Sequence, residues 1–178
     1  FYTNTAASRA AGIDADLSYE LSRGDSRLTA ALYGNYIIES EDQFSPVRPA
    51  TKTFDRMFYP ARLRMRGGVM WSLGAFSANM FANYVSSYED SRALNAPATK
   101  VDSWLTFDAS LQYDFDRAGA GGLISGAKLT LSVLNILDES PPRVAFGIHV
   151  TESNYVAYDT ANADPDGRTI ALQLTKQW

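Results

Sequence analysis

The last residues of the chain, 168–178, read RTIALQLTKQW, and this stretch decides the fold. Ile170, Leu172 and Leu174 alternate with threonine, alanine and glutamine, and the stretch ends on Trp178. Side chains that repeat every two residues are typical of a β-strand with one apolar and one polar face. We therefore expect the chain to end in a two-faced strand that stops on an aromatic residue.

The same alternation recurs along the chain and predicts about seven strands of roughly ten residues each. Besides the terminal strand, the alternating segments are 13–21, 28–38, 63–73, 76–84, 105–115 and 129–133. A tilted strand needs roughly ten residues to cross a membrane, so each of these segments has about the right length.

The connections between the segments alternate between short and long. The shorter ones are 22–26, 74–75 and 116–126, and the long ones are 39–61, 87–102 and 139–167. All seven prolines fall in the long connections, as expected because proline cannot donate a hydrogen bond within a sheet. Short turns on one side and long loops on the other are typical of outer-membrane β-barrels.

Composition narrows the class of protein. The 178 residues are 46% hydrophobic with a net charge of −4, and the apolar residues nowhere form the run of about 18 that a transmembrane helix needs. There is no basic stripe, so a nucleic-acid partner is not expected. Cysteine is absent, which excludes disulfides and thiolate metal sites, and no signal peptide precedes the first segment. The sequence is therefore that of a mature protein or of a fragment.

The predicted fold is all-β: an antiparallel up-and-down transmembrane β-barrel segment, with about seven strands of a larger barrel. If the last strand ends in the periplasm, outward-facing aromatic residues gather at both strand ends, as interfacial burial would select. Those at the periplasmic ends are Tyr19, Trp71, Phe76, Tyr113, Phe115 and Trp178, and those at the opposite ends are Tyr36, Tyr84 and Tyr88. Lys176 is the one outward charge, and it can snorkel to the interface.

The polar face of the segments carries many charges, which predicts a wet or plugged lumen instead of a dry core. Its charged members are Asp14, Asp16, Glu20, Arg27, Arg64, Arg66, Asp108, Asp114 and Lys128.

Two motifs near the end of the chain carry a family resemblance. Residues 126–142 contain N-x-x-D-x-x-P-P after an alternating segment, and residues 158–168 read Y-D-x-x-N-x-D-P-x-G-R before the last strand. Together with the terminal aromatic strand, they resemble the C-terminal end of the β-barrel of TonB-dependent outer-membrane receptors.

The resemblance implies a Gram-negative outer-membrane receptor whose barrel has about 22 strands and a plugged lumen. Such receptors import ferric siderophores, cobalamin or carbohydrates with energy delivered through TonB. Residues 1–178 are then expected to be the C-terminal portion of the barrel, with the plug domain, the TonB box and the upstream strands absent. The terminal strand, with Leu172, Leu174 and Trp178, would be the signal read by the barrel-assembly machinery. Outer-membrane lipid, TonB and a small nutrient ligand are the other implied partners.

Candidate substrate contacts lie on the polar face and in the loops. Arginine grips carboxylates well, so four arginines are candidates for a cationic mouth that receives an anionic substrate. They are Arg48, Arg56, Arg64 and Arg66. Phe81 and Trp104 are candidates for stacking on a sugar or a catecholate. The alternative for all six is a solvated wall that balances Asp14 and Asp16 or that contacts the plug.

Metal binding and catalysis find little support in the residues. Asp159, Asn162, Asp164 and Asp166 offer hard oxygen ligands, but Asp-Pro-Asp-Gly at 164–167 is better explained as a turn that leads into a strand. His149 is the only histidine, and no serine pairs with it by any motif. We expect no metal, no cofactor and no enzyme activity.

Two other classes of protein stay open beside the receptor. One is a complete, small eight-stranded outer-membrane protein with a structural or adhesive role, which needs one more strand near 144–150. The other is an outer-membrane enzyme. The sequence does not name a transported substrate, because specificity would come from loops and a plug that lie mostly outside this chain.

Overall fold

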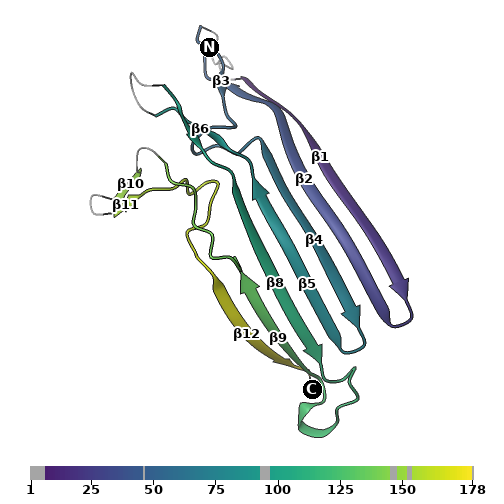
Figure 1. Cartoon of the computed structure of the whole chain (residues 1–178). Helices are drawn as coiled ribbons and strands as arrows, with labels where there is room; N and C mark the ends of the chain where they lie inside the picture. Colours follow the sequence, from purple (N-terminus) through teal and green to yellow (C-terminus); the bar gives the residue numbers. More distant parts are fainter. Residues whose placement is uncertain (1–6, 46, 93–96, 145–147, 152–153, 178) are drawn as a thin grey trace, which may run out of the picture.

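One antiparallel sheet dominates the computed structural model, which describes residues 7–45, 47–92, 97–144, 148–151 and 154–177 (Figure 1). Its seven main strands follow one another in the order β1-β2-β4-β5-β8-β9-β12, with the short β3 paired to β2. They are β1 (Ala7–Arg23), β2 (Ser26–Gln43), β4 (Leu63–Leu73), β5 (Phe76–Val85), β8 (Trp104–Asp114), β9 (Ala127–Leu134) and β12 (Thr169–Lys176). The predicted all-β, up-and-down arrangement of about seven strands is confirmed.

The strand register places the predicted apolar positions on one face. One row of partners runs from Leu17 through Leu32, Gly67 and Ala82 to Phe107. Leu172 continues the apolar face at the far edge of the sheet, and 71% of its surface is exposed. Within the described residues, this face has no covering layer of protein. An uncovered apolar surface that runs across a whole sheet is rare on a soluble protein. We therefore expect this face to contact an apolar environment.

The two ends of the sheet differ in their connections. At one end, Gly24 and Gly74 adopt positive φ angles of 57° and 53° in tight turns, as hairpins with two-residue connections require. The third connection at this end, between β8 and β9, is longer and contains the short 3-10 helix η1 (Gly122–Ile124). The opposite end carries the long loops, as the sequence predicted. Their short strands are β3 (Thr51–Lys52), β6 (Tyr88–Asp90), β7 (Thr99–Val101), β10 (Ile148–Thr151) and β11 (Asn154–Val156).

β1 and β2 extend further than the alternation predicted. They contain 17 and 18 residues, and β2 continues to Gln43, into the expected loop 39–61. A β-bulge interrupts their pairing between Ala11 and Gly12. At the bulge a side-chain Cβ on Gly12 would lie 2.9 Å from the Tyr36 carbonyl oxygen, which explains the glycine. The bulge shifts the alternation by one residue. The part of β2 after Ile38 therefore does not continue the period-two pattern of the part before it.

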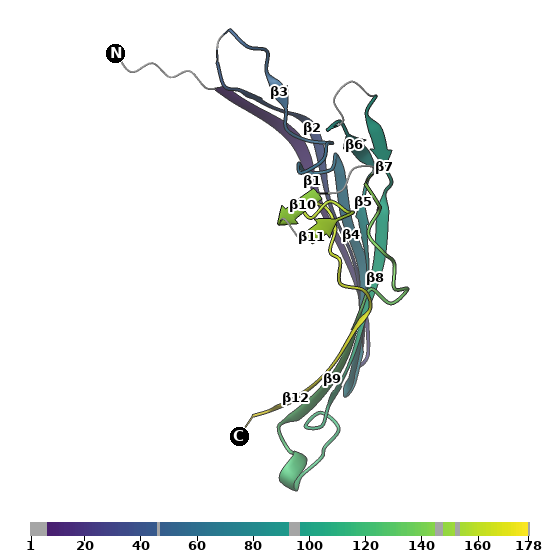
Figure 2. The same cartoon turned by 90° about the vertical axis from the view of Figure 1, so that its left-hand side faces the viewer.

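The sheet is open and bent along its length, and the loop that contains β10 and β11 lies on its concave side (Figure 2). β1 and β12 form its two edges. Residues near 144–150 do form a strand, β10, but it pairs only with β11 in a separate two-stranded sheet. The additional barrel strand that a complete eight-stranded protein would need is therefore not found there. Across the described residues, no helix is both long enough and apolar enough to cross a membrane.

The long loops have a small core of their own, which the sequence did not predict. Met57, Ala61, Tyr88, Val101 and Val144 are buried together, although they come from three separate loops. The placement of Tyr88 in the outward aromatic belt was therefore wrong. Two residues outside any strand separate β6 from β5, so the alternation of β5 does not continue into β6. Tyr88 is instead buried in the core of the loops.

Candidate functional site

Four of the predicted substrate contacts gather on the polar face of the sheet, and we call Arg64, Arg66, Phe81 and Trp104 the polar wall. Arg64 and Arg66 lie two residues apart on β4. The row of Arg64 continues through Val85 on β5 to Trp104 on β8. Phe81 lies on β5 opposite Gly68, in the row beyond Arg66. The alternation of the strands is sufficient to bring these side chains to one surface.

Arg66 is held over an aromatic ring. Its guanidinium carbon lies 4.3 Å from the centre of the Phe81 ring, a cation–π arrangement. Arg66 also donates a hydrogen bond of 2.5 Å to Asn83 Oδ1 and lies 3.7 Å from Asp108 Oδ2. Gly68 provides the room for this arrangement, because a Cβ there would lie 2.2 Å from a Phe81 ring carbon. Arg66 is thus positioned in advance, with about half of its side chain exposed to the concave side.

Arg64 has a different environment. It donates hydrogen bonds to the carbonyl oxygen of Ala161, at 3.1 Å, and to the side-chain oxygen of Asn162. Its Nε is buried and, within the described residues, has no hydrogen-bond partner. Arg64 therefore joins the middle of the sheet to the loop that leads into β12.

This loop is fixed by two buried side chains, Asp159 and Asn162, which we call the loop clamp. Asp159 is 0% exposed, and its carboxylate accepts hydrogen bonds from the backbone N–H of Phe58 at 3.2 Å and of Ala161 at 3.0 Å. Asn162 donates to the Tyr59 carbonyl oxygen at 2.8 Å and to Asp159 Oδ2 at 2.7 Å. The clamp joins segments about a hundred positions apart in sequence, and it satisfies backbone groups that would otherwise be buried without partners.

The clamp also changes the chemistry of its neighbour Tyr88. Burial, with the negative charge of Asp159 close by, raises the pKa of the Tyr88 phenol well above its ordinary value. Tyr88 therefore stays neutral and keeps its hydroxyl hydrogen under all physiological conditions.

The loop clamp accounts for two of the four residues considered as calcium ligands. Both Asp159 oxygens already accept N–H donors, which leaves them poorly suited to a cation. Asp164 instead accepts a hydrogen bond from the backbone N–H of Asp166 at 3.0 Å. This is the local geometry of an Asx turn, so the turn interpretation of 164–167 is confirmed.

The first motif forms a second junction, between the end of β9 and the start of β12. Asn135 and Asp138 both have positive φ, and the Asn135 side chain bonds both the N–H and the C=O of Glu139 at 2.9 Å. Asp138 Oδ1 accepts the backbone N–H of Arg168 at 2.8 Å. A Cβ at Gly167 would lie 2.7 Å from that same oxygen, which explains the glycine before Arg168. The two motifs thus contact each other.

The other two predicted arginines do not join the polar wall. Arg48 lies exposed in the loop after β2, where its carbonyl oxygen accepts a hydrogen bond of 2.9 Å from Gln43 Nε2. Arg56 donates to the Lys52 carbonyl oxygen at 3.3 Å and to Ser91 Oγ at 3.1 Å, and so links two loops. The four arginines therefore do not form one mouth.

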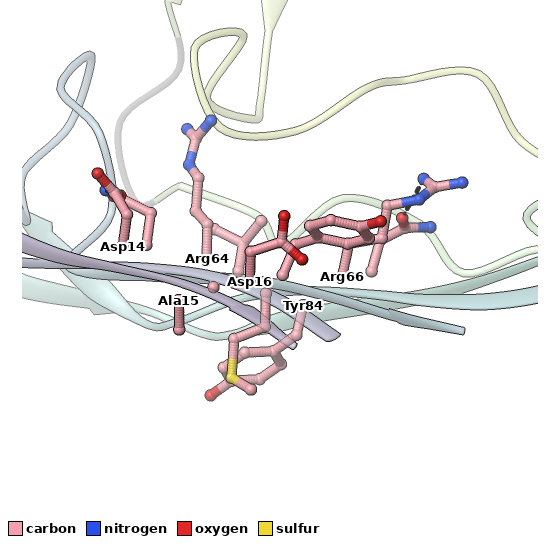
Figure 3. A pocket seen from close by; sticks show the side chains of 12 residues that line it. Asp14, Ala15, Asp16, Arg64, Arg66 and Tyr84 are labelled. Carbon is pink, nitrogen blue, oxygen red and sulfur yellow. Dashed lines mark hydrogen bonds between the residues drawn. The ribbon is translucent and has the colours of Figure 1, made fainter. Parts of the chain in front are cut away.

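An open hollow of about 520 Å³ follows the row Ala15, Gly34, Met65 and Tyr84, and its lining is mostly apolar (Figure 3). Of the polar wall, only Arg64 and Arg66 are among its lining residues. Asp14, Asp16, Arg64 and Arg66 rise from the concave side of the sheet, whereas Ala15 and Tyr84 point to the opposite side. Asn35 contributes a hydrogen bond of 2.6 Å to Asp14. Sequence reasoning named the charged residues but missed the amides Asn35 and Asn83, which occupy polar positions of the same period.

The residues proposed as the assembly signal are only partly described. Leu172 and Leu174 lie on the outward face, and both are exposed. Trp178 lies outside the described residues.

An uncovered apolar face, a charged concave face, tight turns at one end and folded loops at the other define the wall of an outer-membrane-type β-barrel. A family model described as TonB dependent receptor-like, beta-barrel matches residues 1–136, and the chain belongs to this family of Gram-negative outer-membrane receptors. The match ends just after β9, so the two C-terminal motifs lie mostly beyond it and add to it. Comparisons with curated proteins and with solved structures find no match.

Proposed function

We propose that this chain forms wall and vestibule of a receptor that imports a scarce nutrient across the outer membrane with energy from TonB. The observation that carries the proposal is the two-faced sheet, whose apolar side suits lipid and whose charged side is wet. Further strands and a plug, encoded upstream, would complete the barrel and contact TonB. The barrel-assembly machinery would read the terminal strand, and no catalytic step belongs to this chain.

Within this function, Arg66 is the residue that we propose to meet the substrate. Arg64 is engaged by the loop clamp, and Arg48 and Arg56 lie in the loops, whereas Arg66 is half exposed above Phe81. The Trp104 indole N–H, in the row of Arg64, is buried and, among the described residues, has no acceptor. A guanidinium over an aromatic ring suits an anionic ligand with planar groups, and a ferric catecholate siderophore has both properties.

Uptake measurements on the full receptor test this assignment. Arg66→Met keeps the length of the side chain but removes its charge, and we expect it to lower uptake of a radiolabelled ferric catecholate by about tenfold, from the loss of one charge-assisted contact. Arg48→Met is the matched control and should leave uptake unchanged. Receptor levels in the membrane are measured in parallel. Equal uptake by both variants and the wild type would remove Arg66 from the substrate path.

A further inference from the structure

The turn between β8 and β9 presents an unusual apolar tip at the short-turn end of the sheet. Leu123 is 90% exposed and its neighbour Ile124 is 49% exposed. The other two turns at this end are tight and place only small or polar residues, such as Gly24 and Asp25, at their tips. The tip is therefore a local feature of one turn and does not repeat around the sheet.

Hydrogen bonds close the turn although its tip is exposed. The Asp116 carboxylate accepts hydrogen bonds from Ser125 Oγ at 3.1 Å and from the Gly126 N–H at 2.5 Å, and so joins the two ends of the turn. The Ala120 N–H bonds the Phe115 carbonyl oxygen at 2.9 Å. Since the polar groups hold the shape, the aliphatic tip is not needed as a core for the turn.

A lysine brings this tip to the outward side of the sheet. Lys176 lies opposite Ala127, in the phase of the apolar positions Leu174 and Leu129. Its ammonium donates a hydrogen bond of 2.8 Å to the carbonyl oxygen of Leu123. The turn therefore lies beside the C-terminal end of β12, at the lower end of the sheet (Figure 1).

An aromatic cluster lies directly above the turn. The ring centres of Phe76 and Tyr113 are 4.7 Å apart, and those of Tyr113 and Phe115 are 4.9 Å apart. Aromatic residues of this kind mark the depth of the lipid headgroups. Phe115 immediately precedes the turn, so the turn begins beside this outward aromatic cluster.

We propose that Leu123 and Ile124 insert into the phospholipid interface at the short-turn end and anchor this part of the sheet to the leaflet. The proposal rests on the outer-membrane function proposed above. The transfer of aliphatic side chains out of water lowers the free energy, and shallow insertion at the membrane interface is enough for this transfer. Lys176 lies where a snorkelling cation meets the headgroups while it holds the tip in place.

Site-specific labelling of the full receptor in phospholipid vesicles tests the anchor. This chain contains no cysteine, so Leu123→Cys and Ile124→Cys each give a unique attachment point in it for an environment-sensitive fluorophore. Cysteines elsewhere in the receptor are replaced by serine. We expect both labels to shift their emission to shorter wavelength and to be quenched by brominated phospholipid.

Two controls give the result its meaning. Leu172→Cys, mid-strand on the outward face, reports whether the barrel is in the membrane, and Asp25→Cys reports on an ordinary polar turn at the same end. We expect quenching at 123 and 124 to be within about twofold of that at 172, and position 25 to stay unquenched. If 172 is quenched but 123 and 124 behave like 25, the anchor is wrong and the barrel stands. A blue shift at 123 without quenching means burial against protein and also overturns the anchor. An unquenched label at 172 overturns the membrane barrel itself.

Discussion

Gly68 shows how the lack of a side chain can decide the geometry of a polar surface. Because Gly68 has no side chain, the Phe81 ring can lie directly over its backbone and support the Arg66 guanidinium. Gly34, on the neighbouring strand, has no such role, since a Cβ there would meet nothing closer than 3.8 Å. The two glycines are therefore a matched pair for mutation.

We expect Gly68→Ala to destabilise the folded receptor by about 1–3 kcal/mol, because the new methyl group forces the Phe81 ring out of its position. Gly34→Ala should be close to neutral. Urea unfolding of the receptor in lipid vesicles measures both. If the two variants unfold at the same urea concentration, the Phe81 ring moves aside at no cost, and the support of Arg66 by that ring is not a fixed feature.

At the scale of single elements, β12 shows the two faces most clearly. Leu172 pairs with Leu131 and faces outward, whereas Gln173 pairs with Thr130 on the polar side. Leu172→Arg should lower the yield of folded barrel, because an arginine at the lipid midplane costs roughly 2–4 kcal/mol. Gln173→Arg should leave the yield nearly intact.

Gel mobility without boiling separates the folded and unfolded forms of these two variants. Equal losses at both positions would mean that protein covers both faces of β12, which would contradict a lipid-facing strand. A larger loss at 173 would mean that the inward and outward faces are reversed.

The elements also show which parts of the fold the sequence could predict. The seven strands and their phase followed from alternation alone, because one face meets an apolar surrounding and the other meets water. The extension of β2 past Ile38 could not be predicted, since the bulge opposite Gly12 breaks the period. The polar wall follows from the phase of β4, β5 and β8.

The loop clamp was beyond prediction for a different reason. Asp159 and Asn162 stood out in a motif, but their partners Phe58 and Tyr59 lie about a hundred positions away. Contacts of this kind between loops have no period, and no local pattern reports them. The burial of Tyr88 depends on the same contacts.

At the scale of the whole molecule, the clamp makes a prediction about access from outside the cell. The long loops should be extracellular, so proteases added to intact cells should cut within 139–167 and spare 116–126. Asp159→Asn replaces an oxygen that accepts N–H donors with an NH₂ group, at a cost of about 1–3 kcal/mol, and should speed this cleavage.

Asp164→Asn is the matched control for the clamp, because an asparagine oxygen can accept the Asp166 N–H equally well. Mass spectrometry of the released peptides locates the cuts, and wild-type rates for this control are expected. Cleavage confined to 116–126 would reverse the orientation of the barrel. A cleavage rate for Asp159→Asn no higher than that of the control would show that the clamp does not restrain the loop.

The loop clamp also bears on the shape of the barrel. The chain runs from β4 through β5, β8 and β9 to β12 as an arc, and the loop before β12 returns to Arg64 and to the segment before β4. This contact links the two ends of the curved part of the sheet. Its length is therefore expected to limit how strongly the sheet curves between β4 and β12. The contact between Arg64 and Asn162 would then help to determine the width of the barrel lumen. A substitution that lengthens or shortens this contact is then expected to change the curvature of the sheet.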